Sequence, residues 1–280
     1  MVVAAGGLGT RVQGWSRYLP KEWLPVGGRP GIVHLLEEIA ELGPAHVVVV
    51  YHPYYERFTA WARHALAAQG HDRYLRSAGH RLPAATGELA GMTVEWVAQI
   101  GAYGDLTSLL NGADHLAQAG GGGELYVAFG DNVYPQASPL AELRQAPPGV
   151  AVLARPYRAE LAPQRGVIVT EVGPDNARRC MIELVEKPSP RAAAALEHRY
   201  GVGGLMLLEG RARVDAAFID FAREHTGEAN AEPRLSLVLA AWARTHPVRV
   251  VSTPSEVVDL GAPDGWSRRK PCPALPGPEC

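Results

Sequence analysis

Three glycines and two cations near the start of the chain have the types and spacing of a phosphate-binding turn. Gly6, Gly7 and Gly9 directly follow a short apolar run. Glycines in such a turn expose backbone N–H groups and let a nucleotide approach the main chain closely. Arg11 and Lys21 add the fixed positive charge that a polyphosphate requires. The pattern favours a phosphate site, although a tight turn with surface charges has the same composition.

Two common nucleotide-binding fingerprints are missing from this stretch. Neither the dinucleotide pattern G-x-G-x-x-G nor the Walker pattern G-x-x-x-x-G-K-[ST] is present. The sequence instead has G-x-G-T-R over 7–11, then eight residues, then P-K-E-x-L-P-V over 20–26. This pair of motifs resembles the sugar-1-phosphate nucleotidyltransferases, close to the bacterial UTP–glucose-1-phosphate uridylyltransferase type. The resemblance covers residues 2–266.

The resemblance implies a nucleotide site around the glycine turn. Arg11 would hold the leaving pyrophosphate, and Lys21 would stabilise charge on the α-phosphate. Gln99 has an amide that can pair with both an acceptor and a donor on a pyrimidine edge, so UTP or dTTP is favoured. The implied nucleotide-binding residues are Ala5, Gly6, Gly7, Leu8, Gly9, Thr10, Gln99 and Gly104.

Two aspartates are implied as ligands of Mg²⁺. Asp131 follows an apolar strand in FGDNVY, where the family places a metal-binding carboxylate, and Asp259 stands in the late D-x-G segment. Mg²⁺ is usually held by one or two carboxylates together with substrate phosphates. Either aspartate alone is as well explained as a helix cap or turn residue.

Residues in the second half are implied to bind the sugar phosphate. Glu186 and Lys187 resemble the family's E-K-P motif, in which the glutamate would accept hydrogen bonds from sugar hydroxyls and the lysine would neutralise the phosphate. Gly166, Gly203 and Asn132 complete the implied sugar site. A strand-end Glu–Lys pair is otherwise an ordinary solvated ion pair.

Several positions depart from the family pattern. Arg165 replaces the aromatic residue that often precedes the glycine, and Ile100 replaces the glycine after the glutamine. Gly14 and Ser16 stand where proline and threonine are usual, and residues 71–90 form an insertion typical of the uridylyltransferase branch. The base and the sugar are therefore less well defined than the reaction.

The elements that must position these residues alternate between strands and helices. Strands are predicted at 2–5, 46–51, 93–99 and 124–129, with helices between them. This order favours a largely parallel sheet with helices on both faces. The resemblance implies the Rossmann-like, mixed sheet of the nucleotide-diphospho-sugar transferase fold. Ligands gather at the carboxyl ends of such strands, which would bring Gly6, Gln99 and Asp131 to one rim.

In the second half the alternation of strands and helices is predicted to be less regular. Five strands are predicted there. Strands are predicted at 150–154, 166–171, 182–186, 203–208 and 248–251. We expect one nucleotidyltransferase domain over 1–268, with a nucleotide-binding half (1–135), a sugar-binding half (136–268) and a loose tail (269–280).

Composition limits the classes of function. The 280 residues are 47% hydrophobic and 20% charged with a net charge of −2, so a nucleic-acid backbone is not an expected partner. No apolar run approaches the roughly 18 residues of a membrane span, so no membrane partner is expected. Three scattered cysteines do not predict a disulfide framework, which favours the cytoplasm. The family commonly forms homodimers or homotetramers.

The expected reaction joins an NTP and a sugar-1-phosphate into an NDP-sugar, with release of pyrophosphate. The acceptor phosphate would attack the α-phosphorus in line, assisted by Mg²⁺ and with no covalent enzyme intermediate. Two alternatives stay open: a cytidylyltransferase that acts on a non-sugar phosphate, and a non-catalytic homologue that senses nucleotide sugars.

Overall fold

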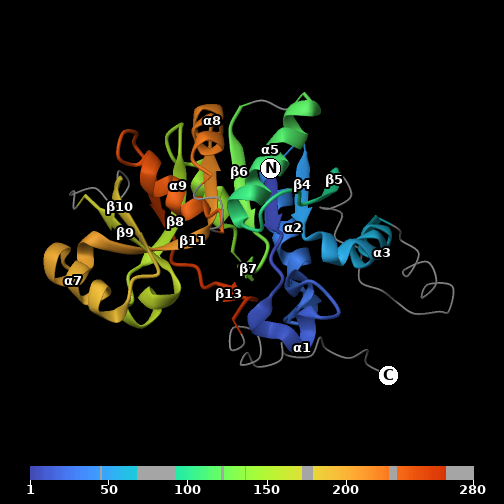
Figure 1. Cartoon of the computed structure of the whole chain (residues 1–280), viewed down its shortest axis with the longest axis horizontal. Coiled ribbons are helices and arrows are strands. Elements are labelled where there is room, and N and C mark those ends of the chain that lie inside the picture. Colours follow the sequence, from blue (N-terminus) through green and yellow to red (C-terminus); the bar gives the residue numbers. More distant parts are fainter. Residues whose placement is uncertain are drawn as a thin grey trace, which may run out of the picture.

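The chain was analysed as a computed structural model. It describes residues 1–44, 46–67, 92–120, 123–135, 137–171, 179–226 and 232–262. The predicted insertion at 71–90 and the predicted tail at 269–280 lie outside these residues. Figure 1 shows the sheet running across the molecule, with helices on both sides of it.

Four parallel strands form the first half of a nine-stranded sheet, in the order β6-β1-β4-β5. Their bounds are Leu125–Phe129 for β6, Val2–Ala5 for β1, Val47–Tyr51 for β4 and Val94–Ala98 for β5. Since they are parallel, their carboxyl ends lie at one edge of the sheet. The predicted mixed, largely parallel sheet is confirmed.

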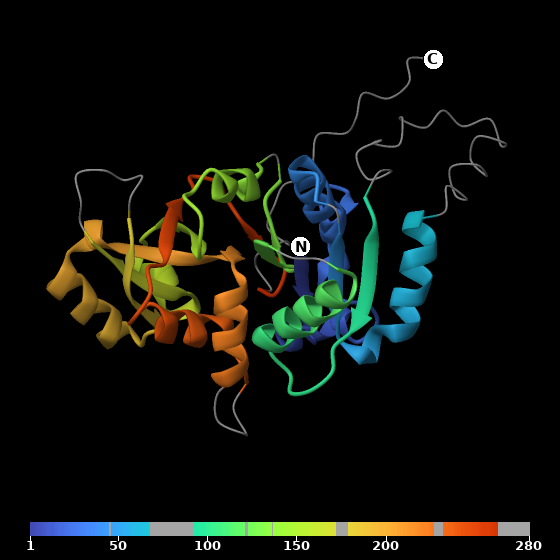
Figure 2. The same ribbon diagram turned by 90° about the horizontal axis from the view of Figure 1, so that it is seen from above.

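Helices cover both faces of these strands. Alternate residues of a strand point to opposite faces, so Val47 and Val49 pack with α2 (Gly31–Leu42), whereas Val48 and Val50 pack with Leu116 of α5. The helix α5 spans Asp105–Gln118 and α3 spans Glu56–Ala67. Figure 2 shows α5 and α3 beside the strands of this half. The apolar run of β4 is buried because both of its faces are covered.

The second half is built around one long strand, β11 (Leu205–Val214), which pairs antiparallel with three others. Those partners are β6, β8 (Ala151–Pro156) and β9 (Gly166–Thr170). The strand was predicted to end at residue 208. It continues to Val214 because its later charged residues are buried and paired; an irregularity between Leu208 and Ala212 interrupts its pairing with β8, and along its other edge the partner changes from β9 to β6.

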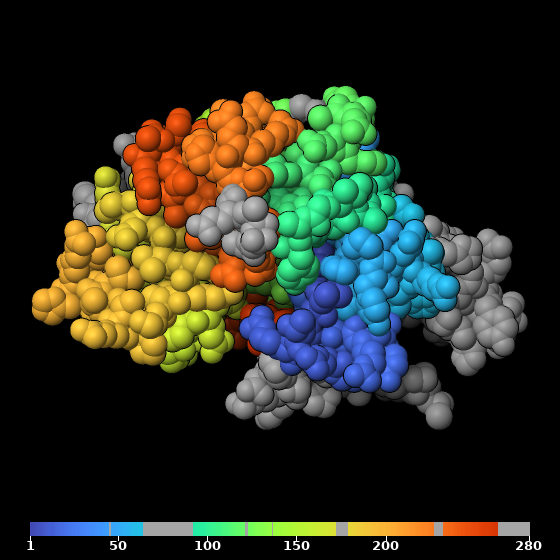
Figure 3. All heavy atoms as spheres, in the orientation of Figure 1, coloured from blue at the N-terminus to red at the C-terminus, as the bar shows by residue number. Residues whose placement is uncertain are grey.

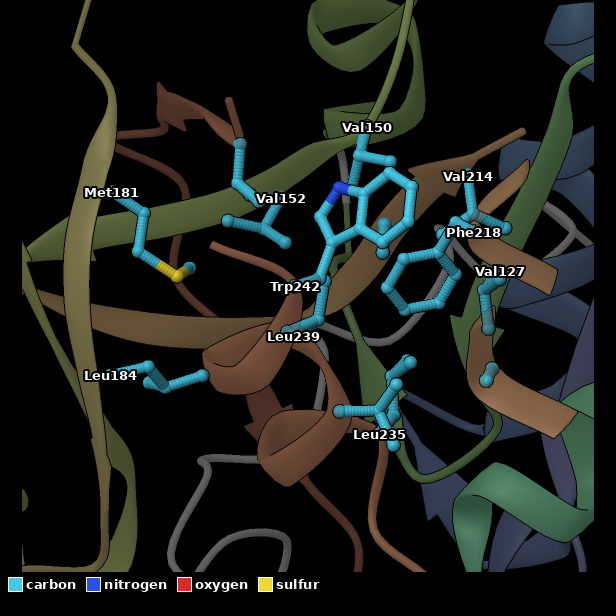
Figure 4. Packing of buried hydrophobic residues seen from close by; sticks show 14 of the residues in the cluster. Val127, Val150, Val152, Met181, Leu184, Val214, Phe218, Leu235, Leu239 and Trp242 are labelled. Carbon is cyan, nitrogen blue, oxygen red and sulfur yellow. The ribbon is translucent and has the colours of Figure 1, made fainter. Parts of the chain in front are cut away.

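The remaining elements extend and cover this half. The strand β10 (Met181–Glu186) pairs with β9, and β12 (Arg249–Ser252) pairs with β8. The other described helices of the second half are α6 (Pro139–Arg144), α7 (Pro190–Tyr200), α8 (Ala216–Glu224) and α9 (Leu235–Trp242). Figure 4 shows Trp242 and Phe218 meeting in the apolar core between α8, α9 and the sheet, with ring centroids 5.5 Å apart.

Two short strand pairs lie outside the main sheet. One joins β2 (Pro25–Val26) to β3 (Arg29–Pro30), and the other joins β7 (Asn132–Val133) to β13 (Val258–Asp259). In the second pair Asp259 lies opposite Asn132. A segment near the end of the described chain therefore returns to the carboxyl end of β6.

Candidate active site

The glycine turn follows β1 and has a left-handed residue at its centre. Gly9 has φ of 61°, and it caps a short 3-10 helix, Thr10–Val12. The Tyr55 hydroxyl lies within hydrogen-bonding distance of two carbonyls, Leu8 O at 3.2 Å and Ser16 O at 2.6 Å. These contacts hold both ends of the turn against the chain that follows β4.

Lys21 and Asp131 form a buried ion pair beside this turn. Lys21 Nζ lies 2.5 Å from Asp131 Oδ2, and a Cβ placed on Gly7 would lie 2.9 Å from the same Nζ. The absence of a side chain at Gly7 therefore leaves room for the lysine. Burial works against both charges, but their attraction outweighs it: the pKa of Lys21 is raised, and that of Asp131 is lowered to about 2. Both groups are charged near neutral pH.

Glu22 is a buried carboxylate with no hydrogen-bond donor among the described residues. Its side chain is 1% exposed, and Oε1 lies 3.2 Å from Lys21 Nζ without a hydrogen bond. Burial raises the pKa of Glu22, against the opposing attraction of Lys21. Lys21 thus lies between two carboxylates, with Asp131 the nearer one.

The pairing of β13 with β7 brings Asp259 to Asp131. A Cβ at Gly261 would lie 3.1 Å from Asp131 Oδ2, 3.1 Å from Asp259 Oδ1 and 3.0 Å from an Arg11 guanidinium nitrogen. The two carboxylates and Arg11 therefore surround one small space that only a glycine leaves open. Two oxygen-bearing acids beside such a space fit Mg²⁺, which takes its other ligands from phosphates and water. No group of three or more potential metal-ligating side chains occurs in the part of the chain that the structure describes.

Asn132 and Arg165 complete the surroundings of the carboxylate pair. Asn132 Nδ2 donates to Asp131 Oδ1 at 2.7 Å, and Arg165 donates to Asn132 Oδ1 at 3.1 Å and to Asp259 Oδ2 at 3.3 Å. The backbone N–H of Gly261 donates to Asp259 Oδ1 at 2.8 Å. Each carboxylate oxygen of the pair therefore has a polar neighbour from the protein itself.

Two adjoining hollows of about 190 Å³ each meet at these residues. Figure 3 shows the surface hollowed between the N-terminal segment in blue and the second half in yellow. The first hollow is lined by the glycine turn and residues near it, namely Gly6, Gly7, Gly9, Thr10, Arg11, Lys21, Gly104 and Asp131.

Gln99 is buried against Gly6; its side chain donates to Ala102 O at 3.1 Å and accepts from Ser108 at 2.8 Å. Gln99 itself is not part of the lining of this hollow, because its amide lies behind the glycine turn.

The second hollow contains most of the predicted sugar site. Its lining includes Arg11, Asp131, Asn132, Gly166, Glu186, Lys187 and Asp259. Lys187 has φ of 45°, a conformation that non-glycine residues seldom adopt, and its N–H donates to Arg165 O at 3.1 Å. Gly203 is not part of this lining; it lies in an exposed 3-10 turn, Val202–Gly204. Ala5 and Leu8 belong to the glycine turn but do not line the first hollow.

Two buried acids near the site were not singled out from the sequence. Glu209 on β11 lines the second hollow, lies 3.4 Å from Arg155 and accepts from Tyr134 at 2.8 Å. Glu38 on α2 pairs with Arg211 on β11 at 2.7 Å. Arg211 also donates to the carbonyls of Phe129 and Asn132, so it holds the chain around Asp131 in place. The alternation of Glu209, Arg211 and Arg213 has the period of a strand, which is the one signal the sequence offered.

A family model decides the assignment of this chain. The model of the MobA-like NTP transferase domain matches residues 1–255 of the 280. The chain belongs to the MobA-like NTP transferase family. This membership supports a nucleotidyltransferase activity, and the predicted resemblance to nucleotidyltransferases is confirmed. No curated protein matches the sequence.

Solved structures share the fold of this MobA-like NTP transferase at low identity. A UDP-glucose pyrophosphorylase complexed with UDP-glucose aligns with a TM-score of 0.74 and 18% identity, over 95% of this chain and 94% of the other. A putative glucose-1-phosphate thymidylyltransferase from Bacillus anthracis aligns at 0.68 and 17%, over 95% and 92%. An inositol-1-phosphate CTP transferase from T. maritima aligns at 0.64 and 12%, over 95% and 91%. In the described part of this transferase, none of the helices is both long and apolar enough for a membrane span.

Proposed function

We propose that this transferase makes an NDP-sugar and pyrophosphate from an NTP and a sugar-1-phosphate. The observation that carries the proposal is the convergence of Arg11, Lys21, Asp131 and Asp259 at the junction of two hollows. A reaction between two phosphates needs two adjoining anion sites with compensating charge where they meet. One hollow carries the glycine turn for the nucleotide, and the other carries Lys187 for the acceptor phosphate.

Each cation has a distinct role in this reaction. Arg11 binds the pyrophosphate that leaves, Lys21 stabilises charge on the α-phosphate, and Lys187 holds the acceptor phosphate. Glu186 accepts hydrogen bonds from acceptor hydroxyls. A general base is unnecessary because a phosphate monoester is already ionised at neutral pH. Asp131 and Asp259 would hold Mg²⁺, which when bound reduces the repulsion between the two phosphates.

UTP or dTTP with glucose-1-phosphate is the favoured substrate pair. Support for a pyrimidine comes from the position of Gln99, whose amide lies directly behind Gly6 of the glycine turn. Support for a hexose comes from Glu186 and Gly166, which are paired across β10 and β9 and line the acceptor hollow. The fold neighbours with bound or named glucose substrates agree with this choice.

A cytidylyltransferase acting on a non-sugar phosphate is the second candidate. It is favoured by the fold neighbour named as an inositol-1-phosphate CTP transferase, and by the displacement of Gly203 from the acceptor hollow. A non-catalytic sensor of nucleotide sugars is less well supported, because all four charged residues that the chemistry requires are present and lie together.

The test is a matrix of five NTPs against acceptor phosphates, scored by pyrophosphate release with Mg²⁺ present. The acceptors are several hexose-1-phosphates, inositol-1-phosphate and choline phosphate. Release with UTP or dTTP and a hexose-1-phosphate supports the proposal. Release with CTP and a non-sugar acceptor supports the second candidate. Binding of nucleotide sugars without any release would support the sensor.

A further inference from the structure

Arg165 brings a buried positive charge to a position where an aromatic residue was expected. It directly precedes β9, and its side chain is 16% exposed. Its guanidinium donates to Asp259 and Asn132, and Glu209 lies 4.0 Å away. An aromatic ring at this position would leave Asp259 without an ion pair. The charge of the carboxylate pair therefore depends on a residue in which this chain departs from its family's pattern.

The distances indicate how Arg165 interacts with each of the two neighbouring acids. Glu209 has its own cation, Arg155 at 3.4 Å, and a hydrogen bond from Tyr134. Asp259 has no ion pair other than the one to Arg165, at 3.3 Å, among the residues that the structure describes. The guanidinium is thus hydrogen-bonded to Asp259 and also lies within ion-pair distance of Glu209, which already has a second cation of its own.

A divalent cation that binds between Asp131 and Asp259 must compete with this guanidinium. The guanidinium of Arg165 already donates a hydrogen bond to Asp259 Oδ2 at 3.3 Å, and its positive charge repels a second cation. We propose that Arg165 is a positioning residue that acts as the resident counter-cation of Asp259, so that the nucleotide-free protein binds divalent metal weakly and takes it up together with the NTP. This inference rests on the proposed function, since it treats the carboxylate pair as a metal site.

Uptake with the nucleotide follows from charge balance in the same space. A metal ion that arrives with an NTP brings phosphate oxygens with it, and these give the displaced guanidinium a new anionic partner. The acceptor hollow that Arg165 lines also receives the acceptor phosphate in the proposed reaction. Metal alone brings no such anion, so it would break the Arg165–Asp259 pair and leave the guanidinium with Glu209, at 4.0 Å, as its remaining acid.

The experiment measures Mn²⁺ binding to the full chain without nucleotide, from the loss of the free-ion EPR signal. Mn²⁺ is a hard, oxygen-preferring probe for a Mg²⁺ site. Arg165→Gln should tighten Mn²⁺ binding by about tenfold or more, since one unit charge close to the site is removed. Arg165→Lys should stay near the wild type. Arg158→Gln is the matched control, because it removes an arginine of 61% exposure that pairs with Glu160.

The outcomes separate this inference from the proposed function. Tighter binding in Arg165→Gln that disappears in Arg165→Gln/Asp259→Asn supports it. Unchanged or weaker binding in Arg165→Gln overturns it, as does tightening that survives the Asp259 change or is matched by Arg158→Gln. If Arg165→Gln does not fold, as judged by circular dichroism, Arg165→Tyr takes its place with the same outcomes. A wild-type protein that releases no pyrophosphate refutes the proposed function but leaves this comparison of metal affinities valid.

Discussion

Lys21 Nζ lies 2.5 Å from Asp131 Oδ2, although the two residues are 110 positions apart in the sequence. The pair joins the phosphate-binding turn after β1 to the acid after β6, at the carboxyl edge that the parallel strands share. Each partner keeps the other charged within a buried site. In the proposed reaction the lysine leaves this acid, at least in part, when the phosphate binds, so the ion pair keeps Lys21 charged and close to the proposed site until then.

Replacing Lys21 by alanine should lower kcat for pyrophosphate release by about 100- to 1,000-fold, because charge on the α-phosphate loses its stabilising partner. Arg29→Ala is the control, since Arg29 pairs with Glu37 at the surface. Steady-state rates and circular dichroism are measured for both variants. Near-normal turnover in Lys21→Ala would contradict the role given to this lysine.

Asp131→Asn keeps the size of the side chain but removes the charge that pairs with Lys21 and that would hold Mg²⁺. Turnover should fall at least about 100-fold while the fold is retained. Asp114→Asn serves as the control, because Asp114 is 53% exposed and pairs with Arg223 away from the site. Pyrophosphate release is measured over a range of Mg²⁺ concentrations. A variant that regains the full rate at high Mg²⁺ would show that Asp131 affects metal affinity alone.

Gly261→Ala tests the space enclosed by Arg11, Asp131 and Asp259. The added Cβ would lie within 3.0–3.1 Å of all three side chains, so it should lower activity at least about tenfold with little loss of stability. Gly14→Ala is the matched control, because a Cβ at Gly14 meets nothing within 4 Å. Rates and melting temperatures are compared. Equal activity in the two variants would argue against a shared site at Gly261.

Asp105 should make the folded state less stable as pH rises. Burial raises its pKa to about 6 from 3.8, so the folded protein holds a proton between about pH 4 and 6 that the unfolded chain has lost. The contribution of Asp105 to the free energy of unfolding is therefore lost as pH rises through that window, by about 2–3 kcal/mol. Asp105→Asn can still accept from the Leu235 N–H and should be more stable than the wild type at pH 7.5 but not at pH 4. Urea unfolding at both pH values measures this, with the 72% exposed Asp220→Asn as control.

Arg211→Met should destabilise the protein by about 3–5 kcal/mol, because it leaves Glu38 buried without its counter-ion. It should also lower activity, since Arg211 holds the carbonyls of Phe129 and Asn132 around Asp131. Arg223→Met removes two surface ion pairs, to Asp114 and Asp220, and should change stability by less than about 1 kcal/mol. Chemical unfolding of both variants gives the comparison, and similar losses in the two would refute the structural role of Arg211.

The parts of the fold that local patterns determine were predictable. A helix was predicted between the strands at 93–99 and 124–129, and α5 lies there because its apolar stripe is a local signal; α2 ends at Gly43, whose φ of 61° suits glycine. The position of Asp131 beside the glycine turn followed from the parallel order of the first strands. Such inferences need only the period of the apolar residues and the rule that ligands gather where parallel strands end.

The burial of charged side chains could not be predicted from the sequence. Glu38 and Glu209 look like surface acids in the sequence, because nothing local shows that distant cations neutralise them. For the same reason the predicted strand was shorter than β11, since Arg211 and Arg213 interrupt its apolar pattern. The pairing of Arg165 with Asp259, 94 positions later, likewise depends on the tertiary fold alone.

The pairing of β13 with β7 also determines when Asp259 and Asp131 can come together during synthesis. Asp259 reaches Asp131 only through this short pairing, which follows all nine strands of the main sheet in the chain. A nascent chain on the ribosome can therefore contain every strand of its main sheet before it has both carboxylates, while the small apolar cluster that includes Val258 and Leu260 is still incomplete. Among the elements that the structure describes, the one that carries Asp259 is the last in the chain, so under the proposed function a polypeptide that stops before β13 would lack one of the two acids that the reaction needs.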